Sequence, residues 1–151
     1  MSIKDEIADA VRRLQLSTRQ FSVVPDREAR RLFAAFLARF TGGAGVRWWW
    51  ERFTDPSSSW CPADGRGFER LIQIVPDPDE LLWFVAEDDA LEFFPVYETS
   101  ARAAQQVIGE CYGFEYYLIA NDLGWLVCEN HHNRLIVIGD QVAGRLRAMA
   151  S

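Results

Sequence analysis

The sequence predicts one α+β domain covering residues 1–151, in which two N-terminal helices lead into a mainly antiparallel sheet. Over the first 40 residues, apolar side chains recur at spacings of three and four, the period of amphipathic helices. The last third contains three short apolar runs separated by four-residue turns, a pattern typical of an antiparallel meander. Hydrophobic residues form 49% of the chain, which is enough for a packed core. We expect the helices to pack on one face of the sheet.

Two helices are expected before the glycine-rich segment at residues 42–45. The first covers residues 2–16. The second begins at Pro25-Asp26, with Asp26 as its N-cap, and ends at the glycines. The apolar face of the second helix should be buried against the sheet, and it comprises Leu32, Phe33, Phe36, Leu37 and Phe40.

The middle of the chain is predicted to contain four strands, at residues 46–53, 68–75, 81–87 and 91–96. In the first of these, alternation assigns Trp48 and Trp50 to the core and places Trp49 on the opposite face, beside Arg47 and Glu51. Residues 55–67 are rich in proline, serine and glycine, and they are predicted to form a loop.

A third helix follows Thr99-Ser100, extends to about Cys111 and has Gly113 as its terminal glycine. The meander is assigned to residues 114–120, 125–129 and 135–138. Asp140 is expected to cap a short last helix.

Charge is distributed unevenly along the chain. Residues 1–52 hold ten basic and six acidic residues, whereas residues 53–151 hold six and sixteen. Between residues 71 and 101 there are eight acidic residues and no basic one. Such a surface repels nucleic-acid backbones and attracts cationic partners, although a solvated face that maintains solubility is the simpler explanation.

The location predicted from the sequence is the cytoplasm. No apolar run reaches the length of about 20 residues that spans a bilayer, and the N-terminus lacks a secretory pattern. The three cysteines, Cys61, Cys111 and Cys128, have no paired spacing, so we expect free thiols.

The candidate partner-binding residues are Asp88, Asp89 and Glu92, with Trp49 as an exposed aromatic anchor. We expect the three carboxylates to be exposed to solvent. Exposed tryptophan is enriched in binding hot spots, whereas the alternative for Trp49 is a second buried layer.

A metal or acid–base site is the main alternative. The run Cys128-Glu129-Asn130-His131-His132 holds both histidines of the chain, and His131, His132 and Cys128 are its candidate metal ligands. Adjacent residues of a strand point to opposite faces, however, which favours a hydrogen-bonded turn over a chelating pair. The acidic group Glu87-Asp88-Asp89 could assist such a site. No complete cofactor motif is present, so no cofactor is expected and folding should need no metal.

Several segments resemble a family of small uncharacterised bacterial proteins. They are Phe94-Pro95-Val96-Tyr97, Tyr116-Tyr117-Leu118-Ile119, Trp125-Leu126-Val127-Cys128-Glu129-Asn130-His131-His132 and Ile138-Gly139. The family is marked by a Trp-Leu-x-Cys-Glu-Asn-His-His hairpin, and the resemblance covers residues 81–140. The size and the order of elements also resemble the SUKH-type immunity superfamily, whose members protect bacteria from secreted toxins. That resemblance implies protein binding and assigns no catalytic residue.

Three functional hypotheses follow. The first is a non-catalytic binding module of immunity type that recognises a basic protein, such as a toxin domain, through its acidic surface. The second is an enzyme using His131, His132, Glu129 and the acidic group at residues 87–89. The third, nucleic-acid binding, would need Arg30, Arg31, Arg39 and Arg47 on one exposed face and is disfavoured by the net charge of −6.

Overall fold

The three C-terminal apolar runs pair as an antiparallel meander, as the sequence predicts. The computed structural model describes residues 2–43, 47–91 and 93–151. Within them, seven strands form one antiparallel sheet in the order β1-β4-β3-β5-β6-β7-β2. The strands are β1 (Phe21–Val23), β2 (Ser58–Trp60), β3 (Leu81–Ala86), β4 (Val96–Ser100), β5 (Tyr116–Ala120), β6 (Leu126–Glu129) and β7 (Leu135–Ile138).

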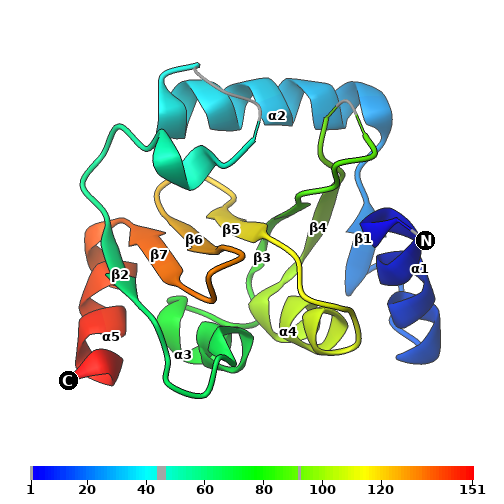
Figure 1. The fold of residues 1–151 in the computed structure, drawn as a ribbon. Helices are drawn as coiled ribbons and strands as arrows, with labels where there is room; N and C mark the ends of the chain where they lie inside the picture. The colour runs from blue at the N-terminus through cyan, green and yellow to red at the C-terminus, as the bar shows by residue number, and fades with distance from the viewer. Residues whose placement is uncertain (1, 44–46, 92) are drawn as a thin grey trace.

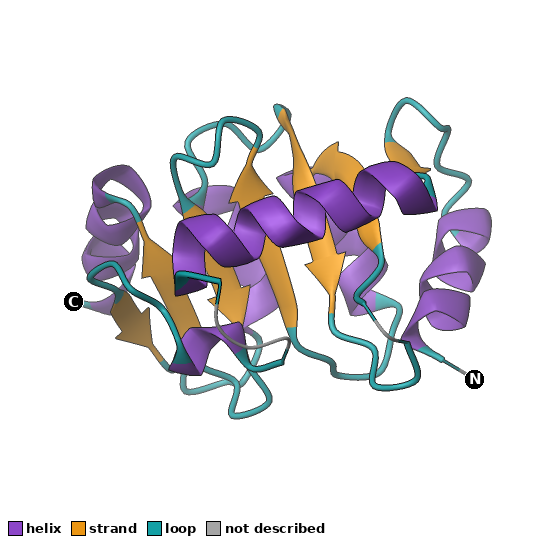
Figure 2. Ribbon diagram, turned by 90° about the horizontal axis from the view of Figure 1, so that it is seen from above, coloured by secondary structure: helices purple, strands orange, loops and turns teal. Residues whose placement is uncertain are grey.

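Helices cover both faces of this sheet, which corrects the expectation that all of them pack on one face. In Figures 1 and 2, α2 crosses one face, and the other helices lie on the opposite side or beside the sheet. The α-helices are α1 (Ile3–Arg13), α2 (Asp26–Thr41), α3 (Leu71–Ile74), α4 (Ala101–Gly109) and α5 (Asp140–Ala150). Two 3₁₀ helices, η1 (Trp49–Glu51) and η2 (Gly67–Arg70), complete the described elements.

The sheet separates two hydrophobic cores. Phe36 and Phe40 of α2 pack on one face, against residues such as Ile119 of β5. Helices α1, α3, α4 and α5 pack on the other face, where Leu118 is a central strand residue. Every residue of β5, β6 and β7 is buried because both faces of these strands are covered.

Helix ends follow the expected chemistry with three exceptions. Ser2 forms a capping box with Asp5 at the start of α1, and the Ser100 hydroxyl accepts a hydrogen bond from the Ala103 amide at the start of α4. Asp26 was predicted as the N-cap of α2, but Pro25 holds that position and Asp26 lies in the first turn, where its charge favours the helix dipole. Helix α4 ends at Gly109, earlier than predicted. Asp140, the expected cap of α5, is its first residue instead, and Gly139 holds the N-cap position.

Three predicted strands of the middle region are wrong. Residues 68–75 form η2 and α3, because their apolar side chains at Phe68, Leu71 and Ile74 follow a helical spacing. The described part of residues 46–53 contains η1, and Val46 lies outside the described residues. The strand expected at 91–96 begins only at Val96 and continues to Ser100.

The segment predicted as a loop at residues 55–67 contributes β2, which pairs with β7 at the edge of the sheet. The apolar face of α2 is less buried than expected, since Leu32 and Leu37 are only partly buried. No helix among the described residues is long and apolar enough to cross a membrane.

Candidate acidic site at one end of the sheet

The acidic and histidine segments singled out in the sequence meet at one end of the sheet. Ala86, the last residue of β3, lies opposite Tyr116, the first residue of β5, and Tyr116 lies opposite Glu129, the last residue of β6. The antiparallel register therefore brings Glu87, Glu115 and His131 to the same place. The Glu87 amide donates to the Glu115 carbonyl at 2.9 Å, which extends the β3–β5 ladder by one step.

Glu87 and Glu115 form a buried carboxyl pair. Their exposed fractions are 8% and 5%, and their side chains are hydrogen-bonded to each other. Burial, this hydrogen bond and repulsion from Glu115 raise the pKa of Glu87 to about 8. At neutral pH, Glu87 therefore keeps its proton.

Glu115 is the acceptor at the centre of the site. Its Oε2 atom accepts hydrogen bonds from Trp50 Nε1 at 2.8 Å and from the His131 amide at 3.2 Å. His131 Nδ1 lies 3.3 Å from the same oxygen. The Trp50 ring N–H and the His131 amide therefore satisfy this buried carboxyl oxygen.

The tryptophan triplet has the opposite arrangement to the predicted one. Trp49 is 0% exposed and stacks on Tyr117 with ring centroids 4.5 Å apart, whereas Trp48 is 45% exposed. Trp50 is half-buried. The prediction failed because the segment turns into η1 instead of continuing as a strand, so alternate residues do not share a face.

Trp48 has a strained backbone that the carboxyl pair holds in place. Its φ of 52° and ψ of 53° lie in the left-handed region, which costs a non-glycine residue free energy. The Trp48 amide donates to Glu87 Oε1 at 3.2 Å, and the Trp49 amide donates to the Tyr117 hydroxyl at 3.0 Å. Glu87 thus holds the turn through the Trp48 amide, and Glu115 holds it through the Trp50 ring, which leaves Trp48 at the surface.

The predicted acidic contact residues differ in their exposure. Asp88 was expected to be exposed, but it is 4% exposed, because its carboxylate accepts hydrogen bonds from the amides of Lys4 and Ala90. It is a structural link between α1 and the turn after β3. Asp89 is exposed as expected and forms an ion pair with Arg47. Glu92 lies outside the described residues.

The two histidines lie close together in a turn. Their ring centroids are 4.0 Å apart, and each ring contacts Trp50 edge-on. Asn130 organises the turn, since its Oδ1 atom accepts from the amides of His132 and Arg134. The prediction of opposite faces was therefore wrong, whereas the prediction of a hydrogen-bonded turn is confirmed.

Cys128 does not join these histidines. It is fully buried in the core under α2, and burial raises the pKa of its thiol well above the ordinary value. Across the part of the chain that the structure describes, no group of three or more histidine, cysteine or acidic side chains is placed to hold a metal ion.

Glu129, part of the alternative enzyme site, forms a separate buried pair with Tyr116. The Tyr116 hydroxyl donates to Glu129 Oε1 at 2.7 Å, and burial raises the pKa of Glu129. Gly67 makes room for this carboxyl group, since a Cβ atom there would lie 2.8 Å from Glu129 Oε2.

An open hollow of about 590 Å³ lies over the carboxyl pair. Its lining includes Trp48, Glu87, Asp89, Glu115 and His131, together with the first residues of α1. A neighbouring hollow of about 380 Å³ contains Glu129, and His131 borders both. Chemically, the first hollow offers the exposed carboxylate of Asp89, the exposed ring of Trp48 and the carboxyl group of Glu87, which can release a proton.

Trp48, Trp50 and Glu115 were missed as site residues by reasoning from the sequence. A usable signal for Glu115 was its position directly before the all-buried strand Tyr116–Ala120, on the segment paired with the end of β3. The exposed position of Trp48 has no such signal, because it depends on hydrogen bonds from the Trp48 and Trp49 amides to residues 39 and 68 positions away.

Comparison with known proteins gives a family and no activity. The family model described as "Family of unknown function (DUF6756)" matches residues 1–150, so the chain belongs to that family. No curated protein and no solved structure matches the chain.

Proposed function

We propose that this member of the DUF6756 family binds a basic protein partner in the cytoplasm, through the end of the sheet that displays Trp48. The setting we propose is bacterial toxin immunity of the SUKH type, in which a binding module blocks a cationic toxin surface. The observation that carries the proposal is the exposed Trp48 ring, held in a strained turn beside the carboxyl-lined hollow.

The strain at Trp48 favours a binding role over a packing role. A tryptophan with left-handed backbone angles lowers the free energy of unfolding. Because Trp48 is 45% exposed, burial of its apolar surface offsets this cost only in part. Large aromatic side chains that are exposed in the free protein and buried on association contribute strongly to affinity. Trp48 therefore replaces Trp49 as the aromatic anchor.

The carboxylates around Trp48 favour a cationic group on the partner. Asp89 is already paired with Arg47, so a partner cation can take the place of Arg47 at that carboxylate. A cation that reaches the hollow also favours the ionised form of Glu87 and so displaces its proton. The acidic stretch at residues 71–101 would accelerate encounter by long-range attraction.

Photo-crosslinking in the native cell tests this interface directly. A photoreactive phenylalanine analogue at position 48 should capture a partner of basic isoelectric point, while the same analogue at Ala148 should not. Ala148 is a suitable control because it is exposed on α5 and does not line the hollow over the carboxyl pair. Equal capture at both positions, or an acidic protein captured at position 48, would contradict the proposal.

Binding measurements with the captured partner separate the anchor from the charges. Trp48→Ala should weaken binding at least about tenfold. Affinity should rise as the pH increases toward 8, because the Glu87 proton is released on binding. Calorimetry in two buffers with different ionisation enthalpies should show that release. An affinity indifferent to Trp48→Ala would place the interface elsewhere.

The second candidate is an acid–base enzyme, favoured by one specific observation. Glu87 is a buried acid with a raised pKa beside the side chain of Glu115, and His131 lies within reach of Glu115. Such a pair can donate and accept protons at one substrate. If this candidate holds, a hydrolase or isomerase substrate screen should reveal turnover that Glu87→Gln abolishes and that falls as the pH rises through 8.

Nucleic-acid binding is the weakest candidate. Two of the four arginines that it requires are engaged in ion pairs, Arg39 with Asp55 and Arg47 with Asp89. Arg30 lies over the ring of Phe93.

A further inference from the structure

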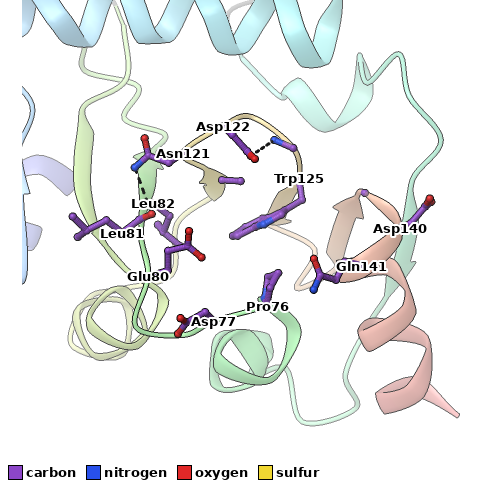
Figure 3. A pocket seen from close by; sticks show the side chains of 13 residues that line it. Pro76, Asp77, Glu80, Leu81, Leu82, Asn121, Asp122, Trp125, Asp140 and Gln141 are labelled. Carbon is purple, nitrogen blue, oxygen red and sulfur yellow. Dashed lines mark hydrogen bonds between the residues drawn. The ribbon is translucent and has the colours of Figure 1, made fainter.

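A second hollow, of about 390 Å³, lies at the end of the sheet opposite to Trp48. It is bounded by the turn before β3, the β5–β6 turn and the start of α5 (Figure 3). The indole ring of Trp125 occupies the middle of this view, between Glu80 and Gln141, and Pro76 lies below it (Figure 3). A hollow of this size matches a small ligand or a single side chain.

The lining combines an aromatic ring with negative charge. Trp125, Pro76 and Leu82 supply apolar surface, and four carboxylates belong to Asp77, Glu80, Asp122 and Asp140. No lysine, arginine or histidine is among the lining residues that the structure describes. Asp140 points away from Trp125 in Figure 3 and lies in the first turn of α5, where it offsets the positive end of the helix dipole.

These carboxylates differ from seven other surface acids, which each form an ion pair with an arginine. The seven are Asp9, Asp55, Asp64, Glu69, Asp79, Asp89 and Glu110. Within the described ranges, none of the four lining acids forms an ion pair, although Asp79 nearby pairs with Arg102. Arg102 interacts electrostatically with Asp77 as well, so the unpaired negative charge of the hollow belongs to Glu80, Asp122 and Asp140.

The hollow is built by close packing. At Gly139 the φ angle is 116°, and a Cβ atom there would lie 2.9 Å from Trp125 Cβ and 3.2 Å from the Gly124 carbonyl oxygen. Only glycine lets the start of α5 approach the β5–β6 turn this closely. Asp122 is also fixed, because its Oδ1 atom accepts the Gly124 amide at 2.8 Å.

We propose that this hollow binds an organic cation, an alkylammonium or a guanidinium group, over the face of Trp125 and between the surrounding carboxylates. Tryptophan is the best aromatic partner for a cation, and nearby carboxylates strengthen the attraction. An anion would be repelled by the carboxylates of the lining. A bare metal ion is disfavoured because no described group of three ligand side chains converges there.

Nuclear magnetic resonance of the full chain tests this proposal through the indole N–H signal of Trp125, assigned with Trp125→Phe. The probes are N-acetyl-arginine amide and methylguanidinium, with N-acetyl-citrulline amide as the uncharged control of the same shape. We expect the arginine amide to shift this signal with saturation in the millimolar range, and the citrulline amide to leave it unmoved. Shifts of equal size from both amides, or no shift from either cation, would overturn the proposal.

A matched pair of variants tests the carboxylates. Glu80→Gln removes one charge from the lining, and Asp79→Asn removes one charge just outside it, from a residue paired with Arg102. We expect Glu80→Gln to weaken cation binding at least about threefold and Asp79→Asn to leave it unchanged. Equal weakening by the two variants would show a general charge effect and refute the site.

The same titrations distinguish two sources of the cation. Tighter binding of methylguanidinium than of the capped arginine would identify a free small cation as the ligand. Tighter binding of the capped arginine would identify an arginine side chain of a protein. Because Trp125 and Trp48 lie at opposite ends of the sheet, a negative result at one end does not contradict the proposal for the other.

Discussion

The two ends of the sheet use carboxylates in different ways. At the Trp48 end, Glu87 and Glu115 are buried, hydrogen-bonded and part of the scaffold. At the Trp125 end, Glu80 and Asp122 are exposed and have no arginine beside them within the described chain. The same side-chain chemistry thus determines shape at one end and surface potential at the other, because burial decides whether a charge must find partners.

The largest difference should come from the tryptophans at the first end. Trp49→Ala removes a fully buried ring and should lower the free energy of unfolding by about 3–5 kcal/mol. Phe36→Ala, also fully buried, should have a similar effect. Trp48→Ala should cost far less, since about half of that ring is in solvent. Urea denaturation measures all three, and a loss below about 1 kcal/mol for Trp49→Ala would refute its place in the core.

Removing a buried carboxylate should cost more than removing an exposed one. Glu115→Ala leaves Trp50 Nε1 and the His131 amide without their acceptor, so the free energy of unfolding should fall by about 2–3 kcal/mol. Glu80→Ala at the other end should change it by less than about 0.5 kcal/mol. If thermal and urea unfolding rank these two variants equally, the contrast between the two ends is wrong.

The proton on Glu87 should make stability depend on pH. Because its folded pKa of about 8 exceeds its ordinary value of 4.5, the folded protein binds more protons than the unfolded chain between these values. Stability from this group is therefore complete at low pH and is lost as the pH rises from about 4.5 to 8.

Glu87→Gln keeps a neutral side chain and should remove this loss. Relative to the wild type, the variant should gain about 1–2 kcal/mol by pH 9, less than the full pKa difference implies, because the open hollow admits water. Urea denaturation at several pH values provides the comparison. Parallel pH profiles for the two proteins would mean that Glu87 is ionised in the folded state.

The smallest effect is expected from metal removal. No described group of metal-ligand type converges at either end, so a chelator should leave the melting temperature unchanged. Thermal melting with and without chelator, combined with elemental analysis, is the measurement. A clear fall in melting temperature accompanied by bound zinc would favour a metal site using His131 and His132.

The meander and the core of α2 could be predicted from the sequence because their signals are local. Phe33, Phe36 and Phe40 are buried as their helical spacing indicates, and β5, β6 and β7 lie within one or two residues of their predicted limits. The uninterrupted apolar run of β7 also signals a strand covered on both faces, so helices on both sides could have been predicted.

The candidate site was less predictable because it depends on contacts between distant segments. The run of three tryptophans has a composition typical of a strand, but long-range hydrogen bonds from its backbone amides to Glu87 and Tyr117 select a turn. Asp88 belongs to an acidic run whose composition is typical of an exposed surface, and only the fold brings the start of α1 over it. Which acid is buried was therefore decided by tertiary structure.

The outermost strands of the sheet, β1 and β2, have three residues each. An edge this short offers few free backbone groups to a strand from another molecule. Helix α5 also packs against β2, which restricts access to that edge. The apolar central strands are consequently shielded from pairing with strands of other molecules. The protein should therefore resist fibril formation as long as β1 and β2 stay folded.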